Sequence, residues 1–187
     1  MLIARAPLRL SLAGGGTDLE AYFEKYGGAV VSTTIDKYFY VITSLSDAPH
    51  IQVSSSDYQT FYRQDIEEPP LWDGELRLPK VIIDHFGIRT GLSVFLASQV
   101  PPGTGLGSSS AVAVALIKAM GVLCNRSMTT HEIANLACQI EIEKLGLPIG
   151  RQDQYAAAFG GLNFMEFTPS GVTVSYTHLT LPTILRV

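Results

Sequence analysis

The sequence has few charged residues and no long apolar run. Asp, Glu, Lys and Arg make up 16% of the 187 residues, and 13 basic against 17 acidic side chains give a net charge of −4. This acidic balance argues against a nucleic-acid partner, which would need a basic surface. No apolar stretch reaches the roughly 18 residues of a membrane span. The N-terminus also lacks the basic and apolar regions of a secretory signal. We therefore expect a cytoplasmic protein that binds neither membrane nor nucleic acid.

Cysteine is also scarce, and its placement is informative. The two cysteines, Cys124 and Cys138, both fall in stretches with helical periodicity. We expect core thiols in a reducing compartment rather than a disulfide or a metal pair. Hydrophobic residues make up 47% of the chain, which excludes disorder and suffices for a sizeable core.

Apolar periodicity predicts strands first and longer helices afterwards. The predicted strands are 2–4, 8–12, 29–35, 38–45, 51–55, 92–100 and 162–167, and the predicted helices are 18–26, 79–86, 108–123, 130–145 and 152–159. Residues 57–74 are polar and contain prolines, so we expect a surface excursion there. Thr129 and Glu132 have the spacing of a capping box. Few strand–helix–strand alternations occur, so the predicted fold class is α+β.

The 17 glycines cluster, most densely in the segment Pro101–Ala111. It reads Pro-Pro-Gly-Thr-Gly-Leu-Gly-Ser-Ser-Ser-Ala and lies between a predicted strand and a predicted helix. Alternating glycines allow positive φ and a close ligand, and the helix N-terminus behind them offers free amides to a phosphate. The serines can cap the helix, bind a phosphate oxygen or ligate Mg²⁺. The spacing matches neither the P-loop nor the dinucleotide fingerprint. The alternative is a glycine-rich turn capped by serine.

A second cluster lies near the N-terminus, where Arg9 interrupts an apolar strand and Gly14-Gly15-Gly16-Thr17-Asp18 follows. An arginine in such a strand requires an anion or a carboxylate as partner. Asp18 stands where a helix is expected to begin. Local sequence therefore favours an N-capping role for Asp18, with ligand binding as the alternative.

The third cluster combines Glu141 with the segment 150–155. On helical spacing Glu141 shares an apolar stripe, whereas Glu143 falls on the solvated face. A buried carboxylate is costly unless it is compensated, so we expect a metal ion or a cation beside Glu141. Asp153 follows Gly150 and precedes three alanines, which suits a carboxylate at a crowded site. A structural cap is the alternative for Asp153.

Taken together and in this order, the three clusters resemble the GHMP small-molecule kinases, above all the D-glycero-D-manno-heptose 7-phosphate kinases. The similarity is strongest in residues 5–18, 27–38 and 152–161 and extends over residues 1–174. The Gly-Leu-Gly-Ser-Ser motif is specific to the superfamily, and the Gly-Gly-Gly-Thr-Asp form narrows it to sugar and sugar-phosphate kinases. The resemblance implies a GHMP kinase N-terminal domain with an α+β fold like domain 2 of ribosomal protein S5.

The resemblance also implies ATP-dependent phosphoryl transfer to the anomeric hydroxyl of a heptose 7-phosphate, with Mg²⁺ as cofactor. Ser109 and Glu141 would hold the metal. Asp153 would be the catalytic base or would orient the hydroxyl, with Arg9 stabilising its charge. The residues implied to bind the sugar are Gly16, Thr17 and Asp18. The residues implied to bind ATP are Pro102, Gly103, Gly105, Leu106, Gly107, Ser108, Ser109 and Ser110.

Two alternatives stay open: a kinase for another sugar such as fucose or galactose, and a non-catalytic sensor of sugar and ATP. The family has a C-terminal glycine-rich motif and a second domain that the chain does not contain. We therefore expect residues 1–174 to be an N-terminal domain that is weakly active or inactive alone. Residues 175–187 resemble translated sequencing-adaptor DNA, and we expect them to be non-native. The sequence indicates no oligomeric state.

Overall fold

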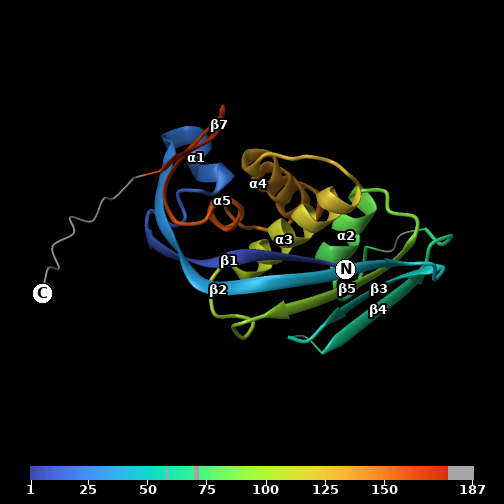
Figure 1. The fold of residues 1–187 in the computed structure, drawn as a ribbon. Helices are drawn as coiled ribbons and strands as arrows, with labels where there is room; N and C mark the ends of the chain where they lie inside the picture. Colours follow the sequence, from blue (N-terminus) through green and yellow to red (C-terminus); the bar gives the residue numbers. More distant parts are fainter. Residues whose placement is uncertain (58, 70–71, 177–187) are drawn as a thin grey trace, which may run out of the picture.

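A computed structural model describes residues 1–57, 59–69 and 72–176, in which helices cover a mixed sheet (Figure 1). The strands are β1 (Leu2–Ala13), β2 (Gly28–Ser46), β3 (His50–Ser55), β4 (Thr60–Asp65), β5 (Gly91–Ser98), β6 (Leu162–Thr168) and β7 (Gly171–Tyr176). The helices are α1 (Glu20–Tyr26), α2 (Arg77–His85), α3 (Ser108–Leu123), α4 (Thr130–Cys138) and α5 (Gln152–Phe159), and a π-helical segment, η1 (Gln139–Lys144), continues α4. The predicted α+β class is confirmed.

The long strand β2 organises the sheet. On one side it pairs antiparallel with β1; on the other, its first part pairs with β6 and its last part with β5. Beyond β5 lie β3 and β4, and beyond β6 lies β7. The β3–β5 pair is parallel and the other pairs are antiparallel. One 19-residue strand therefore joins both halves of the sheet.

Two pairs of predicted strands are each one strand in the structure. Segments 2–4 and 8–12 merge into β1, and segments 29–35 and 38–45 merge into β2. The register of the ladder between β1 and β2 shifts between Pro7 and Arg9. The proline therefore coincides with a β-bulge and does not end the strand. The prediction that residues 57–74 form only a surface excursion is partly wrong, since this segment contains β4. This edge strand buries no residue fully and has a correspondingly weak apolar signal.

The predicted helices 108–123 and 152–159 match α3 and α5, and the capping box of Thr129 and Glu132 is present at α4. The helix expected to run to residue 145 instead changes to π-helix at Gln139. Of the tail expected to be non-native, Ser175 and Tyr176 belong to β7, and residues 177–187 lie outside the described residues.

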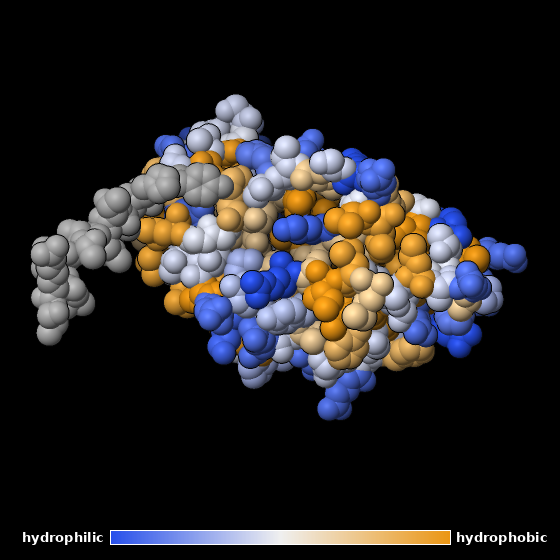
Figure 2. Space-filling view, in the orientation of Figure 1, coloured by the Kyte–Doolittle hydropathy of each residue, from blue (hydrophilic) through white to orange (hydrophobic). Residues whose placement is uncertain are grey.

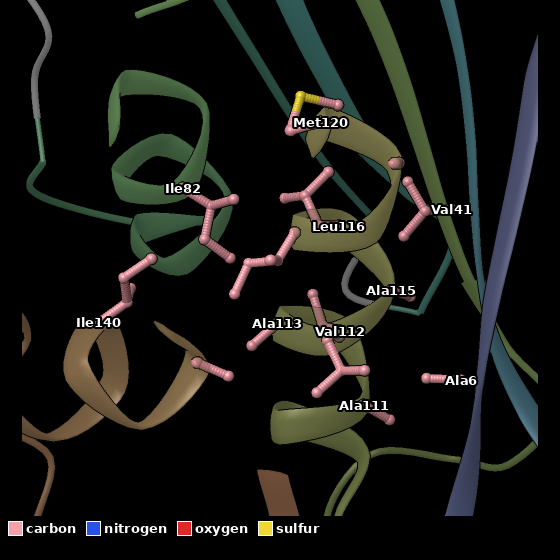
Figure 3. Packing of buried hydrophobic residues seen from close by; sticks show 14 of the residues in the cluster. Ala6, Val41, Ile82, Ala111, Val112, Ala113, Ala115, Leu116, Met120 and Ile140 are labelled. Carbon is pink, nitrogen blue, oxygen red and sulfur yellow. The ribbon is translucent and has the colours of Figure 1, made fainter. Parts of the chain in front are cut away.

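The helix α3 lies at the centre of the core, between the sheet and the other helices (Figure 3). Ala111 and Ala115 face the strands, near Ala6 and Val41, whereas Leu116 points towards α2. The single apolar stripe predicted for α3 is too narrow, because the helix is buried almost all round. Each large apolar side chain that is fully buried here contributes about 1.5–3 kcal/mol to the free energy of unfolding.

The two cysteines differ in environment. Cys138 is buried, and burial raises the pKa of its thiol. Cys124 is exposed, so the expected core position is wrong for this residue, which lies just beyond the end of α3. Both are free thiols. Within the described residues, no helix combines the length and apolar character needed to cross a membrane.

The strand β1 leaves one long edge of the sheet open, because among the described strands it pairs with β2 alone. In Figure 2, exposed apolar side chains gather where β1 begins, and Met1 and Ile3 are both more than half exposed. Further along, the backbone N–H of Arg9 donates to the carbonyl oxygen of Leu106 at 3.0 Å. The open edge of β1 therefore receives the glycine-rich segment.

Candidate active site

Residues 101–107, the glycine loop, connect β5 to α3 and leave the start of α3 uncapped by any side chain. Gly103, Gly105 and Gly107 have φ of 80°, 72° and 73°. Gly107 is the N-cap of α3 and no side chain caps the helix, so the alternative of a serine-capped turn is wrong. The free amides of the first turn and the positive end of the helix dipole suit an anionic group.

Gly107 brings the loop against two predicted site residues. A Cβ at this position would lie 3.2 Å from Cγ of Arg9 and 3.4 Å from Oδ2 of Asp153. Its positive φ and this close approach both favour glycine. The Arg9 guanidinium also donates to the carbonyl oxygen of Gly105 at 2.6 Å. The loop is thus anchored to Arg9 by a side-chain and a backbone hydrogen bond.

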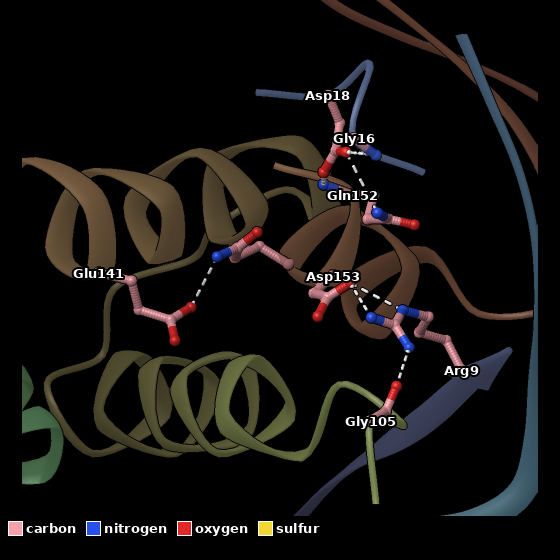
Figure 4. A network of polar contacts seen from close by, with 8 residues as sticks. Arg9, Gly16, Asp18, Gly105, Glu141, Gln152 and Asp153 are labelled. Carbon is pink, nitrogen blue, oxygen red and sulfur yellow. Dashed lines mark hydrogen bonds and ion pairs between the residues drawn. The ribbon is translucent and has the colours of Figure 1, made fainter. Parts of the chain in front are cut away.

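Arg9 and Asp153 form an ion pair at the centre of the site (Figure 4). Nε and Nη2 of Arg9 contact the same carboxylate oxygen, Oδ1, at 2.7 and 2.6 Å. Among the described contacts none involves Oδ2, so this oxygen is available to a ligand. Burial raises the pKa of Asp153 while the charge and hydrogen bonds of Arg9 lower it, and the net direction is upward. The capping alternative is wrong, because the N-cap of α5 is Arg151 and Asp153 points to Arg9.

Asp18 is buried and joins the first glycine cluster to α5. Its carboxylate accepts hydrogen bonds from the backbone N–H of Gly16 at 3.0 Å, and from the backbone N–H and side-chain amide of Gln152 at 3.1 and 3.2 Å. N-capping of α1 is therefore wrong, since Leu19 occupies that position. A Cβ at Gly150 would overlap the Asp18 carboxylate, so glycine is required there.

Glu141 is fully buried on η1, and its carboxylate accepts hydrogen bonds from neutral side chains. The Ser109 hydroxyl donates to Oε1 at 3.0 Å, and the Gln154 amide donates to Oε2 at 2.8 Å. Burial raises the pKa of Glu141, and hydrogen bonds from Gln154, Ser110 and Ser109 partly offset this effect. Among the described residues no cation pairs with Glu141. The sequence reasoning did not single out Gln154, whose only signal was a polar residue directly after Asp153.

Two cavities flank the start of α3. The first, the acceptor cavity, measures about 240 Å³ and is lined by Arg9, Gly16, Asp18, Leu19, Pro148, Ile149, Gly150, Gln152 and Asp153. The second, the α2 cavity, measures about 370 Å³; Phe39, Leu96, Ser109 and Val112 line part of it. Pro102 and Ser108 line a smaller hollow beside the α2 cavity.

The predicted residues thus assemble around the glycine loop, with one exception. Gly16 and Asp18 line the acceptor cavity, but Thr17 does not. Its hydroxyl donates to the carbonyl oxygen of Gly14 and accepts from the N–H of Ala29. Thr17 therefore fastens the turn that follows β1 to the start of β2.

Ser109 and Glu141 fit a Mg²⁺ ion that is shared with phosphate oxygens. Both supply hard oxygen ligands, and Mg²⁺ is commonly bound by one or two protein groups together with substrate phosphates. A buried carboxylate without a cationic partner is the group that such an ion would neutralise. In the described part of the chain no cluster of three or more His, Cys, Asp or Glu could hold a metal by itself.

Comparison with known proteins shows the family to which the chain belongs. Residues 77–161 match the family profile described as the GHMP kinases N terminal domain. The chain belongs to the GHMP kinase family, and its α+β fold is the N-terminal domain of that family.

Among the relatives is the D-glycero-alpha-D-manno-heptose 7-phosphate kinase of Campylobacter jejuni. It is 40% identical over 168 residues, covering 87% of this chain and 50% of that protein. The mevalonate kinase of Pyrococcus abyssi is 27% identical over 198 residues, covering 95% and 57%. The crystal structure of a D-glycero-D-manno-heptose 1-phosphate kinase from B. thetaiotaomicron superposes with a TM-score of 0.87 at 35% identity, covering 93% and 59%. The chain spans about half the length of the curated relatives it matches.

Replacing Asp18 by alanine should destabilise the fold. Asp18→Ala removes a buried carboxylate and the three part-buried hydrogen bonds that it accepts from Gly16 and Gln152, so we expect the free energy of unfolding to fall by about 1–3 kcal/mol in urea denaturation. Asp36→Ala, at an exposed position of β2, serves as the control and should change it by less than about 0.5 kcal/mol. Equal losses in the two variants would contradict the bridging role of Asp18.

Proposed function

We propose that the chain is the catalytic N-terminal domain of an ATP-dependent sugar-phosphate kinase, which transfers a phosphoryl group to the anomeric hydroxyl of D-glycero-D-manno-heptose 7-phosphate. The observation that carries the proposal is the Asp153 carboxylate. One oxygen is held by Arg9, and the other, which has no hydrogen bond among the described residues, lies beside the acceptor cavity and the glycine loop. The names of the heptose-phosphate kinases among the similar proteins support the substrate class.

The nucleotide would occupy the other side of the loop. The apolar walls of the α2 cavity suit a nucleobase, and Ser109 belongs both to this cavity and to the uncapped start of α3. Phosphates that extend from the cavity would meet the free amides of that helix. The loop residues from Pro102 to Ser110 would then surround the phosphates. The acceptor sugar would lie on the opposite side, in the acceptor cavity.

Phosphoryl transfer requires positioning and neutralisation of charge more than covalent chemistry by the protein. Oδ2 of Asp153 would accept a hydrogen bond from the attacking hydroxyl and take its proton as the bond to the γ-phosphorus forms, while the bond from that phosphorus to the β–γ bridging oxygen breaks and ADP leaves. Arg9 would keep the carboxylate oriented through Oδ1 and would stabilise the negative charge near the loop. Asp18 and Gln152 would contact hydroxyl groups of the sugar at the cavity wall.

A Mg²⁺ ion bound with ATP would neutralise phosphate charge during transfer. Ser109 and Glu141 would hold it.

The free thiols of Cys124 and Cys138 fit a cytoplasmic location, where cysteines stay reduced. We also propose that residues 1–174 pair with a further domain in the full-length protein, since the matched relatives are about twice as long.

Asparagine at position 153 should separate catalysis from binding. Asp153→Asn keeps the side-chain volume but removes the base, so we expect kcat to fall by about 10²–10⁴-fold while ADP affinity stays nearly unchanged. ADP release and ADP binding in the full-length protein measure the two effects, and Asp36→Asn is the matched control. A wild-type protein that binds ATP and sugar but never releases ADP would support the alternative of a non-catalytic sensor.

Loss of Arg9 should move the pH dependence of the reaction. Arg9→Met removes the contributions that lower the pKa of Asp153, so the pKa rises further and the active carboxylate forms only at higher pH. We expect the acidic limb of the kcat/KM profile to move to higher pH. The control is Arg89→Met, which breaks an ion pair with Asp84 away from the site. If the acidic limb of Arg9→Met stays where it is in the wild type, Asp153 is not the group whose titration produces it.

A substrate panel distinguishes the sugars. We expect the full-length protein to phosphorylate heptose 7-phosphate with a kcat/KM far above that for free galactose or fucose. Phosphate release from the product by mild acid would identify an anomeric phosphate. Preferred turnover of a free hexose would assign the protein to the alternative sugar kinases.

A further inference from the structure

Gln154 is a fully buried side chain with a single hydrogen bond among the described residues. Its Nε2 donates to Oε2 of Glu141 at 2.8 Å, whereas its own Oε1 is buried without a partner in the described structure. An unsatisfied buried carbonyl is unfavourable, and methionine or leucine would fill the same space without that cost. The presence of glutamine at this position is therefore explained by its hydrogen bond to Glu141 and not by packing.

The amide determines which side of the Glu141 carboxylate faces the glycine loop. With Oε2 occupied by Gln154, the other oxygen, Oε1, is the one that meets the Ser109 hydroxyl at 3.0 Å. The amide cannot be reversed, because its carbonyl would then face a carboxylate oxygen. Glu141 lies in the π-helical segment η1, and short π-helical segments within helices are frequent at functional sites.

The position of Gln154 also links the two halves of the site. It follows Asp153 directly in the first turn of α5, yet the two side chains serve different groups: Asp153 pairs with Arg9, and Gln154 contacts Glu141. A single rigid helical turn thus sets both the proposed base and the proposed metal carboxylate.

We propose that Gln154 is a positioning residue that orients Glu141 so that its Oε1 and the Ser109 hydroxyl share a divalent cation. This inference rests on the proposed function, because the cation would accompany a nucleotide. Gln154 does not itself touch metal or substrate. Its loss would weaken cation binding while the nucleotide and sugar contacts stay in place.

The test is a titration with Mn²⁺ followed by electron paramagnetic resonance, in the full-length protein with ADP present. We expect Gln154→Met to raise the Mn²⁺ dissociation constant by about 10- to 100-fold, the loss typical when a partner that orients a metal ligand is removed. ADP binding in EDTA and the KM for the sugar should not change. Should Gln154→Met not fold, Gln154→Asn removes the same contact, because its amide is one methylene shorter.

The matched control is Tyr155→Phe, which removes another side-chain hydrogen bond of α5, the part-buried one from the Tyr155 hydroxyl to Asn135 at 2.6 Å. It should lower the thermal midpoint and leave Mn²⁺ affinity unchanged. Unchanged Mn²⁺ affinity in Gln154→Met, equal weakening in Tyr155→Phe, or no Mn²⁺ binding by the wild type would each overturn the inference. Mn²⁺ binding that depends on Gln154 in a protein without kinase activity would instead uphold it and remove the proposed function.

Discussion

The ion pair between Arg9 and Asp153 is the contact on which the rest of the site depends. It joins residues 144 positions apart in sequence, and Arg9 also binds the glycine loop through its side chain and its backbone N–H. Strand β1, the loop and helix α5 therefore meet at one guanidinium group. Arginine suits this role because its planar donors can serve several acceptors at once. Oδ2 of Asp153 has no hydrogen bond among the described residues, and in the proposed function it would face the attacking hydroxyl.

Two buried carboxylates among the described residues, Asp18 and Glu141, lie near this pair, and both accept hydrogen bonds from neutral donors. Asp18 secures the start of α5 to the first glycine cluster, and Glu141 joins η1 to α3 and α5. Burying a carboxylate is costly, and hydrogen bonds from neutral groups compensate it only in part. A buried carboxylate of this kind stabilises a core poorly, but it is well placed to bind a cation or a polar ligand. Both carboxylates lie near the glycine loop, so the free-energy cost of burying them is explained by the ligands that we propose to bind there.

Much of the fold and of the site could be predicted from local patterns. The strand signals, the limits of α3 and α5 and the capping box of Thr129 and Glu132 are set by neighbouring residues, so periodicity and capping chemistry suffice to find them. The site residues carried signals of the same kind: an arginine in an apolar strand, alternating glycines before serines, a glutamate on an apolar stripe. The capping role favoured for Asp18 and the capping alternative for the serines failed because a capping preference is local, whereas the partners of Asp18 and Ser109 lie on other elements. The only local signal of Gln154 was a polar side chain directly after Asp153, which does not indicate its partner Glu141.

The sequence by itself determined the α+β class, the order of the elements and the residue types that bear charge and glycine at the site, since these follow from periodicity, composition and turn chemistry. Only the tertiary structure decided which groups meet. It merged four predicted strands into β1 and β2, turned part of a predicted helix into η1 and placed Gln154 against Glu141. It also directed Asp18 to Gln152 rather than to its own helix. The physical reason is that a buried polar group takes the partner that the packed chain brings within hydrogen-bond distance, and that distance is not encoded in neighbouring residues.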